Sequence, residues 1–272
     1  MSVASGTGVD RLAVGDLSVA YHATGEGDRV VLIHGLGQDL GIWGPIQDAW
    51  PSARTIAYDL RGHGSTTVGA PEGTLAQLGR DLVGLLESVG PATCVGFSLG
   101  GSVALWAASE RPDLVVAVVA VATSSVVGRA AADAMGERIE QVESGGPARL
   151  AEVLASDTRS QLAGDESRLD EIVAARVAAS SAVEGYLNGA RAVRDMRDHP
   201  LQERLGAVHQ PVLVVNGSRD PWCPRRAAEI MLEVLPNAWF AELEGVGHLV
   251  TDVAPDELLE RIRVWTEERG EG

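Results

Sequence analysis

Three side chains in the sequence form a set that could carry out nucleophilic chemistry. Ser98 lies in the stretch GFSLGG, Asp220 in GSRDPWCP and His248 in GVGHL. A serine hydroxyl is a weak nucleophile until a base removes its proton, and the base in turn needs an acid to orient it. The three residue types together fit acyl transfer, in which the serine oxygen attacks a carbonyl carbon.

The residues around Ser98 are typical of a sharp turn between a strand and a helix. Gly96, Gly100 and Gly101 flank the serine, and glycine allows a tight turn without Cβ clashes. In a G-x-S-x-G turn the serine projects beyond the sheet, beside a helix N-terminus that favours developing negative charge. The alternative is an ordinary turn with a solvent-facing serine, so the assignment depends on the other loops.

The base and the acid each have competitors in the sequence. Asp220 precedes Pro221 and could serve as an Asx-turn residue, but the other position expected for the acid, ATSSVVG after residue 121, offers no carboxylate. His34 is more consistent with supporting its own loop than with acting as the base. The remaining histidines, besides His248, are His22 on an early strand, His63 in a loop, and His199 and His209 near residue 200.

The elements that would position these residues alternate along the chain. Short β-branched and apolar runs predict strands, and leucine-rich runs at helical spacing predict helices. The predicted strands cover residues 29–34, 55–59, 92–97, 114–121, 211–217 and 238–245. The predicted helices cover residues 74–90, 99–110, 225–235 and 256–268. This alternation predicts an α/β fold with a mostly parallel sheet flanked by helices.

The alternation stops between about residues 125 and 210, where four helical patterns follow one another without a strand. We therefore expect residues 1–125 and 210–272 to form the core and residues 126–209 to form a helical cap, or lid. The cap should give an aliphatic lining, since it has no Trp or Phe and one tyrosine, Tyr186. Its Arg129, Arg191 and Arg194 are typical of solvated helix charges; one facing inward could bind a substrate carboxylate.

Composition excludes several classes of function. The formal net charge is −16, which repels nucleic acid and anionic membranes. All 22 basic residues are arginine, so neither a Schiff base nor a lysine-containing phosphate loop is available. Cys94 and Cys223 lack metal-ligand spacing. We expect no metal and no cofactor.

The sequence also suggests where the protein is found. Its first ten residues lack the basic and apolar segments of a secretory signal, and no apolar run reaches the roughly 18 residues needed to span a bilayer. We expect a cytoplasmic protein, a monomer or a homodimer, acting on a small molecule.

At the level of motifs, the chain resembles the α/β-hydrolase fold family over nearly its whole length. HGLGQD is similar to the family's oxyanion loop, YDLRGHGS to its D-x-R-G-H-G motif, and the three loops named first to its catalytic loops. The order Ser98, Asp220, His248 is the order of that family's triad. The esterase, enol-lactonase and cofactor-free haloperoxidase branch is the most similar.

The resemblance implies further site residues. Backbone N–H groups of Leu36 and Leu99 would form the oxyanion hole. Asp59 and Arg61 are expected to form an internal ion pair. A substrate pocket would be lined by Trp43, Phe97, Tyr186 and Trp222.

The expected activity is hydrolysis of a carboxylic ester or lactone through an acyl-enzyme on Ser98. The same triad could instead serve a carbon–carbon bond hydrolase, a perhydrolase or a biosynthetic lyase. A further possibility is a hydrolase-fold receptor that binds a ligand, because fold alone does not determine function.

Overall fold

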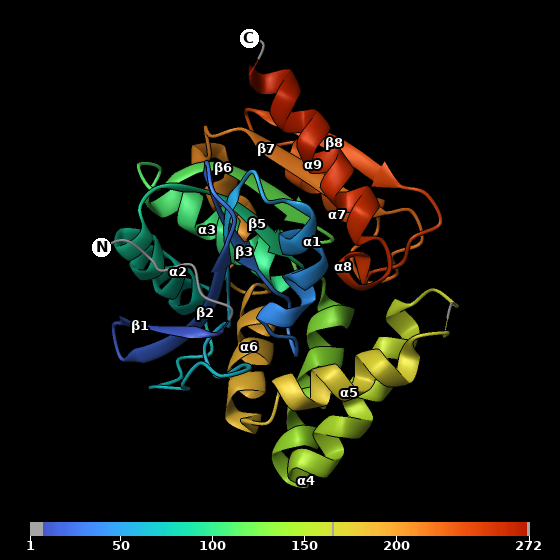
Figure 1. Cartoon of the computed structure of the whole chain (residues 1–272). Helices are drawn as coiled ribbons and strands as arrows, with labels where there is room; N and C mark the ends of the chain where they lie inside the picture. Colours follow the sequence, from blue (N-terminus) through green and yellow to red (C-terminus); the bar gives the residue numbers. More distant parts are fainter. Residues whose placement is uncertain (1–7, 165, 271–272) are drawn as a thin grey trace.

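The chain forms one sheet with helices on both faces, shown in Figure 1. The computed structural model describes residues 8–164 and 166–270, so residues 1–7, where no secretory signal is expected, lie outside it. Its strands are β1 (Asp10–Val14), β2 (Leu17–Thr24), β3 (Arg29–Ile33), β4 (Arg54–Tyr58), β5 (Ala92–Phe97), β6 (Val115–Val121), β7 (Val212–Gly217) and β8 (Ala238–Leu243).

The order of these eight strands across the sheet is β1-β2-β4-β3-β5-β6-β7-β8. From β4 to β8 every neighbouring pair is parallel, whereas β2 pairs antiparallel with both β1 and β4. The predicted mostly parallel α/β sheet is therefore confirmed. The antiparallel hairpin of β1 and β2 at the edge was not predicted.

Helices cover the two faces of the sheet and extend beyond one end of it. The helices beside the sheet are α1 (Gly44–Ala49), α2 (Leu75–Val89), α3 (Leu99–Glu110), α7 (Arg225–Leu232), α8 (Val250–Val253) and α9 (Pro255–Gly270). Two 3₁₀ segments lie in the loops: η1 (Leu40–Trp43) precedes α1, and η2 (Leu201–Ala207) precedes β7. Among the described residues, none of the helices is both long and apolar enough to cross a membrane.

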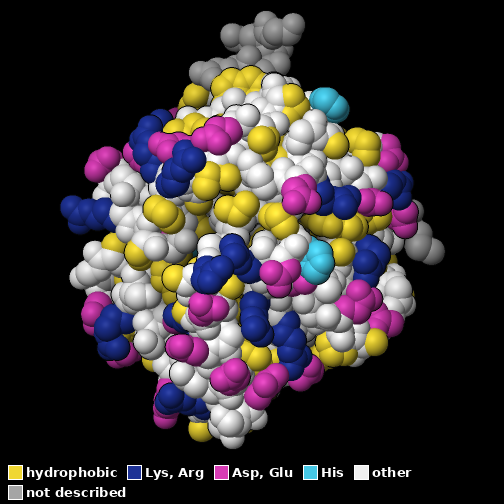
Figure 2. Space-filling view, turned by 180° about the vertical axis from the view of Figure 1, so that it is seen from behind, with side chains coloured by type: hydrophobic (Ala, Val, Ile, Leu, Met, Phe, Trp, Pro, Cys, Tyr) yellow, Lys and Arg dark blue, Asp and Glu magenta, His cyan; other side chains and the backbone are white. Residues whose placement is uncertain are grey.

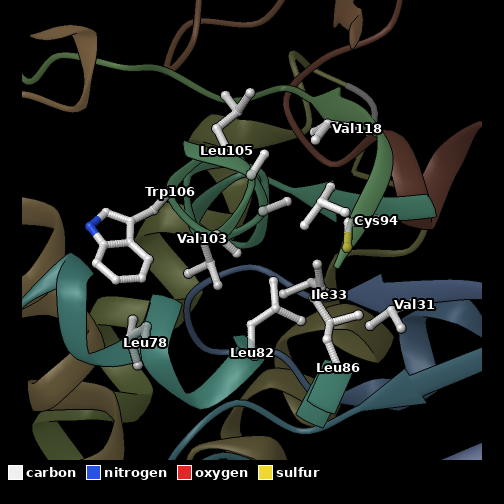
Figure 3. Close-up of a cluster of buried hydrophobic side chains, with 14 of the residues drawn as sticks. Val31, Ile33, Leu78, Leu82, Leu86, Cys94, Val103, Leu105, Trp106 and Val118 are labelled. Atoms are coloured by element: carbon white, nitrogen blue, oxygen red, sulfur yellow. The ribbon is translucent and has the colours of Figure 1, made fainter. Parts of the chain in front are cut away.

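Alternating strand residues build a separate hydrophobic core on each face. On β3, Val31 and Ile33 belong to the cluster under α2 and α3, whereas Val30 and Leu32 belong to the cluster under α1 and α9. Figure 3 shows the first cluster, with leucines of α2 directed towards α3 and β3. This packing fixes the helix α3 that begins directly after Ser98.

Three further helices lie together at one end of the molecule (Figure 1): α4 (Arg129–Gln161), α5 (Leu169–Ala179) and α6 (Val183–Asp195). They occupy the segment predicted to be helical and free of strands. The first two predicted helices are the two arms of α4, which bends at Gly146 (φ 60°, ψ −149°). Pro147 follows, and its ring prevents a regular helix from continuing through this point.

Candidate active site

Ser98 occupies a sharp turn between β5 and α3, and its backbone has φ 51° and ψ −117°. The neighbouring positions must be glycine, because no space is left there for a Cβ atom. A Cβ on Gly96 would lie 2.2 Å from the carbonyl oxygen of Gly100, and a Cβ on Gly100 would lie 2.3 Å from that of Ile33. Both contacts are with backbone, which cannot move aside, so larger residues are excluded from both sides of the serine.

A hydroxyl network holds this turn from the end of β6. The Ser98 N–H donates to Val121 O at 2.8 Å, and Thr123 Oγ1 donates to Ser98 O at 2.6 Å. Ser102 Oγ lies 3.0 Å from Thr123 Oγ1. No short-range sequence signal links Thr123 to Ser98, because the two residues meet only when β5 and β6 pair.

The structure brings Ser98, His248 and Asp220 into one hydrogen-bonded chain. His248 Nε2 lies 3.1 Å from Ser98 Oγ, and Nδ1 lies 2.8 Å from Asp220 Oδ2. The other carboxylate oxygen, Oδ1, accepts the N–H groups of Trp222 at 2.8 Å and Cys223 at 2.9 Å. A carboxylate held in this way fixes the Nδ1–H tautomer, so the Nε2 lone pair faces the serine hydroxyl.

In the described part of the chain, the backbone N–H groups of Leu36 and Leu99 have no hydrogen-bond acceptor. Leu99 is the first residue of α3, so its N–H has no intrahelical partner. On either side of Leu36, the N–H of Gly35 donates to Gln38 Oε1 and that of Gly37 to His63 Nε2, both at 3.2 Å. Both predicted oxyanion donors are thus free of other acceptors.

Two buried histidines support the loop that carries Leu36. His34 Nε2 accepts the N–H of Leu60 at 2.9 Å, which leaves Nδ1–H to donate to Gly35 O at 2.8 Å. Burial and the neighbouring His63 lower the pKa of His34 to about 3, and burial lowers the pKa of His63 to about 4. Both rings are therefore neutral at pH 7 and act through hydrogen bonds.

The expected ion pair between Asp59 and Arg61 does not form. The guanidinium of Arg61 bonds instead to Asp81 and to Asp16, each at 2.8 Å. Asp59 accepts the N–H groups of Leu40 and Ser65, both at 2.7 Å, and burial raises its pKa to about 6. Asp59 is a loop-binding residue rather than the partner of Arg61.

A cavity of about 610 Å³ opens above Ser98. Phe97, Tyr186 and Trp222 line it, together with His248. Trp43 was also expected there, and this expectation is wrong. It is the last residue of η1, and its fully buried side chain belongs to the core cluster under α1 and α9.

The arginines that line the cavity differ from those considered in the sequence. Arg129 and Arg194 are exposed, and Arg191 pairs with Glu143 and Glu184. The lining instead includes Arg138, Arg176 and Arg226. Helical periodicity alone could not single these out, because the kink in α4 and the placement of α5 and α7 decide which of their faces meet the cavity.

The donor set around the acid does not fit a metal ion. Asp220, Cys223 and His248 offer ligand atoms within 4.8 Å of one another. However, both His248 nitrogens are hydrogen-bonded within the chain of three residues, and burial raises the pKa of the Cys223 thiol well above its usual value. A neutral thiol is a poor metal ligand, so these groups are better suited to proton transfer.

The fold and the site together define a class of protein. A model of the alpha/beta hydrolase family matches residues 30–261, and the chain belongs to that family. The chain is similar to 3-oxoadipate enol-lactonase 2 of Acinetobacter baylyi, with 30% identity over 223 residues, 78% of this chain and 79% of that protein. It is also similar to a pimeloyl-acyl-carrier-protein methyl ester esterase of Serratia marcescens, with 29% identity over 90% of this chain and 96% of that protein.

A solved structure has the same fold. The enol-lactonase from Burkholderia xenovorans LB400 matches with a TM-score of 0.85 and 23% identity, over 95% of this chain and 100% of that one. The family resemblance seen in the motifs is confirmed.

Proposed function

We propose that the protein hydrolyses carboxylic esters or lactones by acyl transfer to Ser98. The observation that carries this proposal is the hydrogen-bonded chain from Asp220 through His248 to Ser98, placed at a cavity wall. The names of the two relatives support the bond type, because a lactone is a cyclic ester and the second relative is named for a methyl ester.

The proposed reaction has two half-reactions. Ser98 Oγ attacks the carbonyl carbon while His248 Nε2 takes the hydroxyl proton, and the N–H groups of Leu36 and Leu99 stabilise the oxyanion. The bond between the carbonyl carbon and the leaving oxygen then breaks, and that oxygen receives the proton from His248. Water attacks the acyl-enzyme, gives a proton to His248, and the acid is released as the proton returns to Ser98.

We also propose that residues 126–209 act as a cap over this site. Five aliphatic or thioether side chains from α4, α6 and the residue after α6 line the cavity, namely Ala131, Ala134, Met135, Val193 and Met196. Apolar walls bind the apolar part of a substrate through burial of its surface. The cap therefore favours small esters or lactones with an aliphatic group.

Labelling with a fluorophosphonate, followed by peptide mapping, tests the role of Ser98. We expect one label per chain on Ser98, and no label and no ester turnover in Ser98→Ala. Ser144→Ala is a matched control, since Ser144 is an exposed serine on α4 whose hydroxyl bonds only to helix carbonyls. It should label and turn over substrate as the wild type does.

A panel of aryl esters, thioesters and lactones, run with active-site titration, tests the substrate class. Repeated turnover of esters or lactones supports hydrolysis. Labelling of another serine, or a single turnover with retained product, would contradict the proposal, and the second result would favour a ligand receptor.

A further inference from the structure

Arg176 is a buried arginine whose hydrogen bonds all go to uncharged acceptors. It lies on α5, lines the cavity and is 5% exposed. Nη1 donates to Thr158 Oγ1 at 2.8 Å and to Gln161 Oε1 at 2.6 Å, and Nη2 donates to Leu36 O at 3.2 Å. Burying a guanidinium without a bonded carboxylate is costly. The groups that accept its hydrogen bonds indicate what Arg176 does.

One of those acceptors belongs to the oxyanion loop. The peptide group between Leu36 and Gly37 is held at both ends, because Arg176 binds its carbonyl and His63 accepts its N–H. The preceding peptide group, which carries the N–H of Leu36, is held at its carbonyl by His34. Three side chains therefore fix the direction of the Leu36 N–H, and only Arg176 comes from outside the core.

Another acceptor connects Arg176 to the loop of the base. Gln161, whose side chain binds Arg176, is the last residue of α4, and its backbone carbonyl accepts the N–H of His248 at 2.9 Å. The approach is close, since a Cβ on Gly247 would lie 2.4 Å from that same carbonyl oxygen. Arg176 thus joins the backbone that carries the oxyanion donor to the backbone that carries His248.

We propose that Arg176 is a positioning residue, through which the helices α4 and α5 set the oxyanion hole and the base relative to Ser98. This inference rests on the proposed acyl transfer at Ser98. Arg176 acts through Leu36 and Gln161, and it need not touch the substrate. Its removal should therefore slow the chemical step more than it weakens substrate binding.

The test compares wild type with Arg176→Met, which keeps an unbranched apolar stem and removes the guanidinium donors. Two quantities are measured: the second-order rate of fluorophosphonate labelling at Ser98, and the separate values of kcat and KM for an ester. Loss of one oxyanion donor costs about 10²–10³ in kcat, so a displaced donor should lower kcat and the labelling rate by about tenfold to hundredfold. KM should stay near its wild-type value, and Arg176→Lys should recover part of both rates.

Two other arginines serve as controls. Arg191→Met removes a half-exposed arginine of α6 that pairs with Glu143 and Glu184, and it should leave both rates unchanged. Arg138→Met removes an arginine that lines the same cavity but bonds to Asp157 at 2.8 Å and not to the oxyanion loop. It should change KM more than kcat.

The possible results separate the role of Arg176 from the proposed function. Unchanged labelling and kcat in a folded Arg176→Met protein would overturn the inference, as would a rise in KM with kcat unchanged, which indicates substrate contact instead. If Arg176→Met does not fold, Arg176→Gln carries the same test, because its shorter side chain leaves a polar group among the same neighbours. Absence of labelling at Ser98 in the wild type would instead defeat the proposed function.

Discussion

At the scale of single residues, the proposed nucleophile Ser98 is held in a strained backbone conformation. A positive φ at a residue other than glycine costs on the order of 1–3 kcal/mol and persists only where the surroundings impose it. For Ser98 the surroundings are the two glycines that leave no room for side chains and the hydroxyl of Thr123 that binds its carbonyl. This backbone conformation directs Ser98 Oγ towards the cavity and towards His248.

The residue Asp220 yields a second test of the site. In Asp220→Asn, Oδ1 can still accept the N–H groups of Trp222 and Cys223, so the loop should fold. The amide group now faces His248 Nδ1 and favours the wrong tautomer. We expect kcat to fall by roughly 10⁴, measured by steady-state kinetics together with circular dichroism.

Asp252 is the comparison residue for that test. It follows His248 by a few positions, is half-buried, and its Oδ2 accepts a hydrogen bond from Gln38 Nε2 at 3.1 Å rather than one from a histidine nitrogen. Asp252→Asn should lose much less activity than Asp220→Asn. The reverse order of losses would show that the acid has been assigned to the wrong residue.

At the scale of elements, the oxyanion loop depends on neutral histidines. His63 accepts the N–H of Gly37 through Nε2, and a proton on that nitrogen would abolish the bond. The folded-state pKa of about 4 lies below the ordinary histidine value of 6.5, so the unfolded chain binds the proton more readily. The stabilisation by neutral His63 is therefore present above pH 6.5 and is lost as the pH falls towards 4.

His63→Gln makes this pH dependence measurable, because an amide does not titrate. We expect the free energy of unfolding of wild type to fall more steeply than that of the variant between pH 6.5 and pH 4. The difference in this fall should reach up to about 3 kcal/mol. Urea denaturation at several pH values measures it. Parallel curves would contradict a neutral His63 in the folded protein.

Features that depend only on residues close together in the sequence could be predicted. The turn at Ser98 follows from glycines within three residues of it, and α2 follows from leucines at helical spacing between Thr74 and Gly90. The order of the three catalytic loops was also visible, since each loop follows a predicted strand. These features depend on local sterics and local burial.

Contacts between distant segments could not be predicted in the same way. Arg61 binds Asp16 and Asp81, which are 45 and 20 residues away, in preference to the nearby Asp59. That choice depends on how the edge hairpin and α2 meet the loop. The directions in which the side chains of Trp43 and Arg176 point likewise depend on how whole helices are placed. The residue type alone does not predict that placement.

At the scale of the whole molecule, the three outer helices are bonded to the core at several separate points. The N–H of Gly64 donates to Ala179 O at 2.8 Å, and a Cβ on Gly185 would lie 1.9 Å from Gly62 O. Figure 2 shows acidic and arginine side chains interspersed over the rear face of the molecule.

We therefore expect the cap and the core to unfold in one thermal transition. The six tryptophans all lie outside residues 126–209, but Trp222 Nε1 donates to Ser160 Oγ of α4 at 3.0 Å. The tryptophan fluorescence of a Trp222→Phe variant is therefore used to follow the core. Hydrogen exchange of peptides from α4, α5 and α6 reports on the cap. Coinciding midpoints would support one cooperative unit, and early exchange of the cap peptides with the tryptophan signal unchanged would contradict it.

The outer helices leave the sheet after β6 and return before β7, and these two strands are hydrogen-bonded neighbours, with Val118 opposite Val212. Recombination between family members at these two points would leave the sheet register unchanged, and chimeras should fold readily. Folding alone would not make them active. The incoming segment must also place a carbonyl group at the N–H of His248 and a cation at the carbonyl of Leu36. Only segments that already carry both groups can therefore give an active chimera with a new specificity.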